Sequence, residues 1–243
     1  MQLYDILRYN SLSMNSFQLF NELWAQKKIK TPLFVFIGGY CGTGKSTLAK
    51  ALQAKITEST IVPTGIVRAT CKPFLKNMGD IYGCHTYRLG QFSQNDIELF
   101  ANYKKQSSIL NEPIKELCNF ATSEMQNLII DGNHIFPELV ASIETSLKID
   151  VYMKTSNESQ LIKNMTDITH PRVMIESETE TAKKLHRMTV SEISLSKDMF
   201  EYDQSTEAVN YIEKELSLLL ENVMGIRSSG RIEIPATPSL TIH

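Results

Sequence analysis

The hydrophobic pattern alternates between short apolar runs and longer segments with helical spacing. Five runs predict strands, at 33–38, 60–63, 127–131, 149–153 and, as a short edge strand, 200–203. Apolar residues at intervals of three and four predict helices at 45–57, 94–125, 137–147 and 205–223. Strands that alternate with helices are typical of a parallel sheet covered on both faces. The sequence therefore predicts a three-layer α/β fold.

Composition along the chain predicts three parts. Residues 1–30 are expected to form an N-terminal helical extension that Pro32 stops, and 31–224 the main α/β domain. The Ser, Gly, Pro and Thr content of 225–243 predicts a flexible C-terminal tail. Within the domain, 66–90 lacks clean periodicity and is expected to be a substrate-binding insert, whereas 155–200 is expected to be mostly helical and rich in charge.

A phosphate-binding motif follows the first predicted strand. Residues 39–46 read GYCGTGKS, which fits the G-x-x-x-x-G-K-[ST] pattern and precedes a predicted helix. The glycines permit a tight turn whose backbone N–H groups point at a phosphate, and the helix adds its positive end. This order of strand, loop and helix predicts a P-loop NTPase fold. The residues expected to bind the phosphates of ATP are Gly39, Tyr40, Cys41, Gly42, Thr43, Gly44, Lys45, Ser46 and Thr47.

Candidate chemistry in the loop is divided between two side chains. Lys45 is expected to reach the β- and γ-phosphates, and Ser46 to hold Mg²⁺. Asp131 ends the apolar strand 127–131, at the edge of an α/β sheet where ligands bind. We expect Asp131 to bind Mg²⁺ with Ser46, although a strand-ending Asp before Gly132 also suits a simple turn.

Overall composition limits the partners. The net charge of −2 argues against nucleic-acid or anionic-membrane binding, and a hydrophobic share of 42% in 243 residues allows a good core. No apolar run approaches the length of about 20 residues that spans a bilayer. The four cysteines lack disulfide or zinc spacing. We therefore expect a cytoplasmic protein with a small-molecule substrate; its oligomeric state stays open.

Four blocks in a fixed order resemble the 2-phosphoglycerate kinase family of P-loop small-molecule kinases. The resemblance covers about 33–223 and rests on the P-loop, on the block 63–68 with Phe74 and Leu75, on the triplet 85–87, and on 129–134 followed by Pro137. It implies a kinase domain that uses ATP and Mg²⁺. The acceptor that it implies is 2-phosphoglycerate or a related phosphorylated hydroxy acid.

The resemblance also implies an acceptor pocket. It is expected to contain Arg68, His85, Thr86, Tyr87 and His134. The chemistry of Arg68 fits independently, since a guanidinium binds a phosphate or carboxylate with two parallel hydrogen bonds. The closing lid of such kinases brings arginines to the transferred phosphoryl group, and within 155–200 Arg187 is the preferred candidate and Arg172 the second.

One departure from the family leaves alternatives open. Gly65 stands where the family usually has an Asp that orients or deprotonates the acceptor hydroxyl. A nucleoside or nucleotide kinase remains an alternative, with Phe74, Tyr82 or Tyr87 to stack on a base. A nucleotide-binding protein without catalysis is another, and the loss of the acid at Gly65 is the main argument for it.

Overall fold

The computed structural model describes residues 14–75, 79–167 and 173–224. At its centre is a five-stranded sheet in which every neighbouring pair is parallel, with the strand order β2-β3-β1-β4-β5. The strands are β1 (Phe34–Gly38), β2 (Ser59–Pro63), β3 (Asn127–Asp131), β4 (Lys148–Lys154) and β5 (Met199–Glu201).

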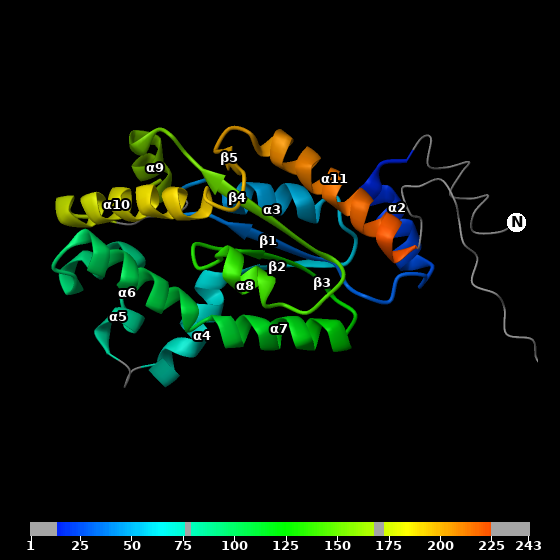
Figure 1. Cartoon of the computed structure of the whole chain (residues 1–243), viewed down its shortest axis with the longest axis horizontal. Coiled ribbons are helices and arrows are strands. Elements are labelled where there is room, and N and C mark those ends of the chain that lie inside the picture. Colours follow the sequence, from blue (N-terminus) through cyan, green and yellow to red (C-terminus); the bar gives the residue numbers. More distant parts are fainter. Residues whose placement is uncertain (1–13, 76–78, 168–172, 225–243) are drawn as a thin grey trace, which may run out of the picture.

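Helices connect the strands and cover both faces of the sheet (Figure 1). They are α2 (Ser16–Ala25), α3 (Lys45–Gln53), α4 (Thr64–Leu75), α5 (Asp80–Gly83), the 3₁₀ helix η2 (Thr86–Phe92), α6 (Asp96–Ser108), α7 (Asn111–Ser123), α8 (Pro137–Ala141), α9 (Glu158–Met165), α10 (Glu176–Ile193) and α11 (Ser205–Val223).

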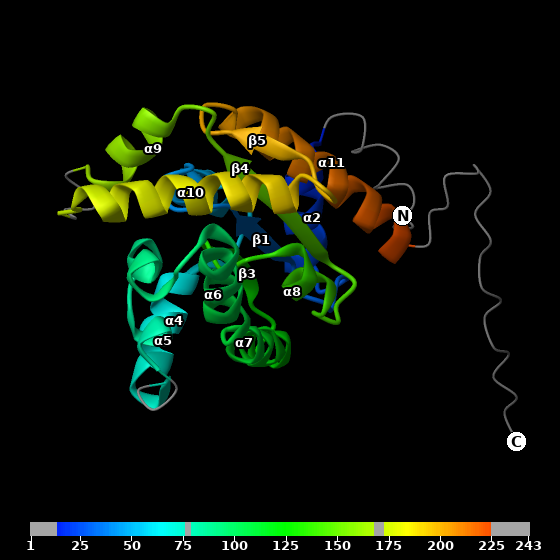
Figure 2. The ribbon, with the colours of Figure 1, turned by 60° about the vertical axis from the view of Figure 1, so that its left-hand side comes forward.

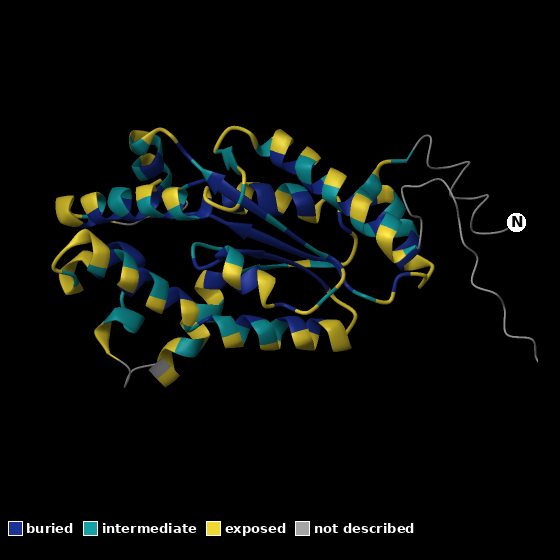
Figure 3. Ribbon diagram, viewed as in Figure 1, coloured by how far each residue is buried: buried dark blue, intermediate teal, exposed yellow. Residues whose placement is uncertain are grey.

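Side chains of β1 alternate between two buried cores. Val35 and Ile37 belong to the core that α2, α3 and α11 contribute to, and Phe34 and Phe36 belong to the core formed with α6, α7, α8 and α10. Buried residues run through the sheet, with exposed ones on the outer sides of the helices (Figure 3). In the turned view, α10 lies between α6 and β5 (Figure 2). The predicted three-layer P-loop NTPase fold with a parallel sheet flanked by helices is confirmed.

Two segments differ from the sequence-based prediction. The insert is more regular than its sequence pattern suggests, because α4 runs for 12 residues with Val67 and Cys71, four positions apart, packed against the core. By contrast, α8 is shorter than the predicted helix 137–147. Lys148 donates hydrogen bonds to the carbonyls of Val140, Ala141 and Ile143, which satisfies the end of this short helix.

The helix near the N-terminus is part of the domain core. Phe17, Phe20 and Leu23 of α2 are buried in the same core as Ile212 and Leu216 of α11. The outermost parts of the predicted extension and tail, 1–13 and 225–243, lie outside the described residues. Across the described ranges, no helix combines the length and hydrophobicity that crossing a bilayer requires.

Candidate functional site

The P-loop and the acidic strand end meet at one edge of the sheet. β1 pairs in parallel with β3, so that Ile37 lies opposite Asp131. The chain then turns sharply at Gly39, whose φ is 124°. A Cβ atom at this position would lie 2.1 Å from the carbonyl oxygen of Met153, so only glycine fits.

Backbone and side chains shape the loop before any ligand contacts it. The carbonyl of Tyr40 accepts hydrogen bonds from Thr43 Oγ1 at 2.8 Å and from Lys45 Nζ at 2.5 Å. Tyr40 and Thr43 are fully buried, while Ser46 and Thr47 are exposed. α3 begins at Lys45, which places the positive end of a nine-residue helix at the loop. This arrangement suits a phosphate chain.

Ser46 and Asp131 meet as the sequence predicts. Ser46 Oγ donates to Asp131 Oδ2 at 3.0 Å, and the other carboxylate oxygen, Oδ1, is buried without a hydrogen-bond partner among the residues that the structure describes. A hydroxyl beside a carboxylate with a spare oxygen fits Mg²⁺, which binds few protein ligands and keeps waters and phosphate oxygens. No group of three His, Cys, Asp or Glu side chains in the described part of the chain forms an all-protein cage.

The loop after β3 packs closely against the start of α4. A Cβ atom at Gly132 would lie 1.7 Å from Thr64 Oγ1, so glycine is required for this contact. Thr64 Oγ1 also lies 3.2 Å from His134 Nδ1. Thr64 and His134 are both buried, so their hydrogen bond fixes the imidazole plane.

His134 is held neutral. Burial lowers its pKa to about 3, and the charges of Arg68 and Lys45 act in the same direction. Its Nε2 atom is buried and makes no hydrogen bond within the described structure. A neutral imidazole with an unused nitrogen is suited to hydrogen bonding rather than to binding an anion by charge.

Arg68 lies one turn beyond Thr64 on α4. Its Nη1 donates to the carbonyl of Cys84 at 2.5 Å, and burial lowers its pKa. None of the ion pairs among the described residues includes Arg68. A half-buried cation without a protein carboxylate is a candidate anion ligand.

The side chains of residues 85–87 differ in their exposure and in their contacts. His85 is exposed and stacks on Tyr87 with ring centroids 5.2 Å apart. Thr86 is buried, and its hydroxyl makes hydrogen bonds within the protein. Their role as acceptor ligands stays a prediction.

Of the two arginines predicted for the lid, the structure describes Arg187 but not Arg172. Arg187 on α10 forms an ion pair with Glu158 on α9, and its side chain is 54% exposed. It does not line the cavity at the P-loop, so its predicted action on the phosphoryl group would require these helices to move. Arg172 lies outside the described residues.

A cavity of about 360 Å³ opens at the P-loop. Its lining includes Lys45, Ser46 and Asp131 together with Thr64 and Gly65 of α4. Arg68, His134 and the triplet 85–87 are not among the lining residues. The cavity therefore brings together both predicted metal ligands and most of the predicted phosphate ligands, whereas all five predicted acceptor ligands lie outside its wall.

Sequence reasoning missed four residues that line this cavity: Lys50, Asn164, Asp167 and Tyr202. Asn164 Nδ2 donates to the carbonyl of Gly42 at 2.7 Å, and the Tyr202 ring packs beside Gly44. Tyr202 follows the short strand β5 and is 39% exposed. Its place near the carboxyl end of the predicted edge strand 200–203 was the signal that could have found it.

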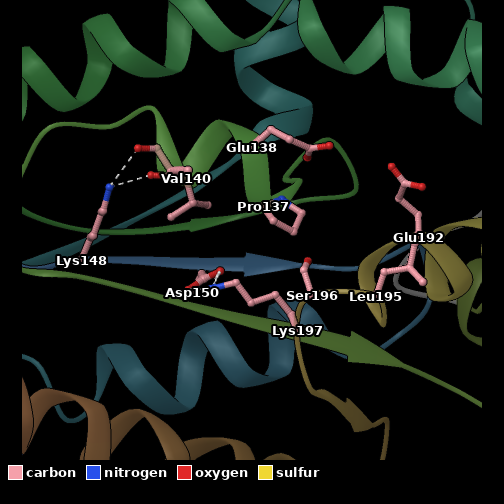
Figure 4. Close-up of a pocket in the computed structure, with 10 residues that line it drawn as sticks. Pro137, Glu138, Val140, Lys148, Asp150, Glu192, Leu195, Ser196 and Lys197 are labelled. Carbon is pink, nitrogen blue, oxygen red and sulfur yellow. Dashed lines mark hydrogen bonds and ion pairs between the residues drawn. The ribbon is translucent and has the colours of Figure 1, made fainter.

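A larger cavity, of about 560 Å³, lies between α8, β4 and the segment after α10 (Figure 4). Its charged groups are paired within the protein. Lys197 lies 2.8 Å from Asp150, and Lys104 bridges Glu138 at 2.8 Å and Glu192 at 3.2 Å. Size alone does not mark the functional site.

The parallel sheet, the glycine-dependent loop and the Ser46–Asp131 pair define the P-loop NTPase fold, whose loop suits the phosphates of a nucleotide. The chain resembles the 2-phosphoglycerate kinase of Pyrococcus horikoshii, with 26% identity over 119 residues, which is 47% of this chain and 39% of that protein. It also resembles an uncharacterised protein of Dictyostelium discoideum, with 23% identity over 112 residues, or 44% of this chain and 13% of that one.

The chain thus spans well under half the length of these curated relatives. No family model matches it. Among solved structures, shikimate kinase from Acinetobacter baumannii in complex with shikimate aligns with 81% of this chain and 97% of that one, at a TM-score of 0.44 and 13% identity.

Proposed function

We propose that the protein is a kinase that transfers the γ-phosphoryl group of ATP to a hydroxyl of a small anionic metabolite. The observation that carries this proposal is the cavity in which Lys45, Ser46 and Asp131 meet the start of α4. A phosphate site and an acceptor helix that share one cavity are what in-line transfer needs. The likeness to a 2-phosphoglycerate kinase makes 2-phosphoglycerate, or a related phosphorylated hydroxy acid, the first acceptor to test.

Each residue has a distinct task in this proposal. Lys45 neutralises charge on the transferred group, and the N–H groups at the start of α3 hold the phosphates. Ser46 and Asp131 would hold Mg²⁺, which supplies further charge neutralisation when bound. Arg68 holds the anionic group of the acceptor, and His134 helps to fix the wall formed by Thr64.

Gly65 is the feature that separates a kinase from a protein that only binds nucleotide. It lines the cavity, and a Cβ atom there would meet nothing within 4 Å, so the structure has room for a side chain. Transfer of a phosphoryl group depends mainly on positioning and charge stabilisation, so the lack of a base need not abolish it. This chemistry favours an active kinase.

The test is a transfer assay with Mg-ATP across phosphoglycerates, sugars and nucleosides. We expect transfer to a phosphorylated hydroxy acid, loss of transfer in Asp131→Asn, and unchanged or faster transfer in Gly65→Asp. Tight Mg-ATP binding without transfer to any acceptor would instead support the binding-only alternative. Preference for nucleosides would support the nucleoside or nucleotide kinase.

A further inference from the structure

A continuous chain of hydrogen bonds joins the acceptor side to the loop after β3. Asn133 Nδ2 donates to Thr86 Oγ1 at 3.0 Å, and Thr86 Oγ1 donates to Gln106 Oε1 at 3.1 Å. Gln106 Nε2 then donates to the carbonyl of Cys84 at 3.0 Å. Arg68 Nη1 donates to that same carbonyl.

Gln106 uses its whole amide in this chain. The side chain is fully buried on α6, its oxygen accepts from Thr86, and its nitrogen donates to the carbonyls of Ile81 and Cys84. A buried amide with both donors and its acceptor engaged holds its partners in one arrangement, because each broken bond would leave a buried polar group unpaired.

α6 holds the loop after β3 at a second point. Tyr103, three residues before Gln106 and therefore on the same side of the helix, donates from its hydroxyl to the carbonyl of Asn133. Both residues are fully buried. One helix thus fixes the loop that follows Asp131 and the turn that receives Arg68.

We propose that Gln106 is a positioning residue that holds Arg68 in place for the acceptor through the carbonyl of Cys84. This inference rests on the proposed role of Arg68 in acceptor binding. Among the described residues, the carbonyl of Cys84 is the one hydrogen-bond acceptor of the guanidinium, so the direction of its remaining N–H groups follows from where that carbonyl lies. Removal of the Gln106 amide frees the carbonyl to shift and loosens the guanidinium.

The chain offers a matched control. Asn102, one turn earlier on α6, is also a buried amide, but it donates to the carbonyl of Phe92 and to Ser93 Oγ, away from Arg68. Gln106→Met and Asn102→Leu therefore each remove a buried amide from the same helix. Only the first interrupts the path to Arg68.

The experiment has two readouts. The first is the rate at which phenylglyoxal modifies Arg68, followed by peptide mass spectrometry. We expect this rate to rise at least about threefold in Gln106→Met, and to stay at the wild-type value in Asn102→Leu. The second readout is steady-state kinetics, in which the acceptor KM should rise about tenfold in Gln106→Met while the KM for ATP is unchanged.

The two readouts separate the two proposals. If wild-type protein transfers phosphate to no acceptor, the kinase proposal fails, while the modification rate still decides the position of Arg68. Equal rates in wild type, Gln106→Met and Asn102→Leu would overturn the role of Gln106. If Gln106→Met does not fold, Gln106→Asn serves instead, because an amide one methylene shorter cannot reach Thr86 and Cys84 together.

Discussion

The two cavities of the molecule differ in how their charges are satisfied. In the larger one, Lys197 is paired with Asp150, and Lys104 with Glu138 and Glu192. Near the smaller one, Arg68 is in none of the ion pairs among the described residues, and Asp131 Oδ1 is buried with neither a hydrogen bond nor an ion pair in that part of the chain. Charged groups that lack a partner within the described protein indicate a ligand-binding site better than the volume of a cavity does.

The largest expected effect comes from the substitution of one lysine at each cavity. Lys45→Ala should lower phosphoryl transfer by about 10²–10³-fold, because it removes a cation that stabilises charge on the transferred group. Lys197→Ala, at the larger cavity, should leave transfer within about twofold of wild type, since its charge serves only Asp150. Parallel transfer assays measure both, and equal losses would contradict the comparison.

The next effect compares an unpaired with a paired arginine. Arg68→Ala should raise the acceptor KM by about 10–100-fold with little change in ATP affinity, since hydrogen bonds to charged groups are worth about 1.5–3 kcal/mol. Arg68→Lys should recover only part of the loss. Arg88, which pairs with Glu178 at 2.7 Å, provides the control. An acceptor KM that rises equally in Arg88→Ala would show that the missing carboxylate partner is irrelevant.

A smaller effect concerns the base of the nucleotide. Tyr202 lines the P-loop cavity beside Gly44, so its ring is placed to stack on adenine. Tyr202→Ala should weaken ATP binding about tenfold, in line with about 1–3 kcal/mol for stacking of a base on an aromatic ring. Calorimetric titration with inorganic triphosphate should show no change. Equal weakening of both ligands would place Tyr202 at the phosphates instead.

The last effect is on stability, rather than on binding or transfer, at mildly acidic pH. The pKa of His134 is about 3 in the folded protein, below the value of 6.5 for a solvated histidine. Between these two values, the imidazole binds a proton in the unfolded chain but not in the folded protein. Below pH 6.5 the free energy of unfolding should therefore fall by about 1.4 kcal/mol per pH unit, until the folded pKa is reached. Burial lowers the pKa of His186 as well, which adds in the same direction.

Denaturant titrations at pH 7 and pH 5 measure this dependence. His134→Gln should reduce the difference between the two pH values. A pH dependence that is the same in His134→Gln and wild type would contradict the burial of a neutral imidazole.

Local patterns predicted much of this molecule. The apolar runs located all five strands, and the motif at 39–46 located the phosphate loop, because both depend on neighbours in sequence. The pairing of Ser46 with Asp131 was also predictable, since parallel strands place their ends at one edge. α8 was harder, because its end is satisfied by Lys148, which belongs to the next strand.

The contacts around Gln106 and Arg187 could not be predicted from local sequence patterns. Nothing near Gln106 in sequence indicates that its amide reaches Thr86 and Cys84, 20 and 22 residues away. The ion pair between Arg187 and Glu158 likewise joins two helices 29 residues apart. Such contacts follow from packing, which a pattern along one chain does not contain.

The contact between Gly132 and Thr64 limits how this protein can change over time. A Cβ atom at Gly132 would lie 1.7 Å from Thr64 Oγ1, 2.7 Å from its Cβ and 2.8 Å from its Cγ2, so the whole Thr64 side chain stands in its way. Loss of that side chain would leave His134 Nδ1 without its hydrogen-bond partner. Single substitutions at either position are therefore both unfavourable, and a side chain at Gly132 requires a change at Thr64 as well. We expect random mutagenesis with selection for folded protein to return these two residues unchanged or replaced jointly.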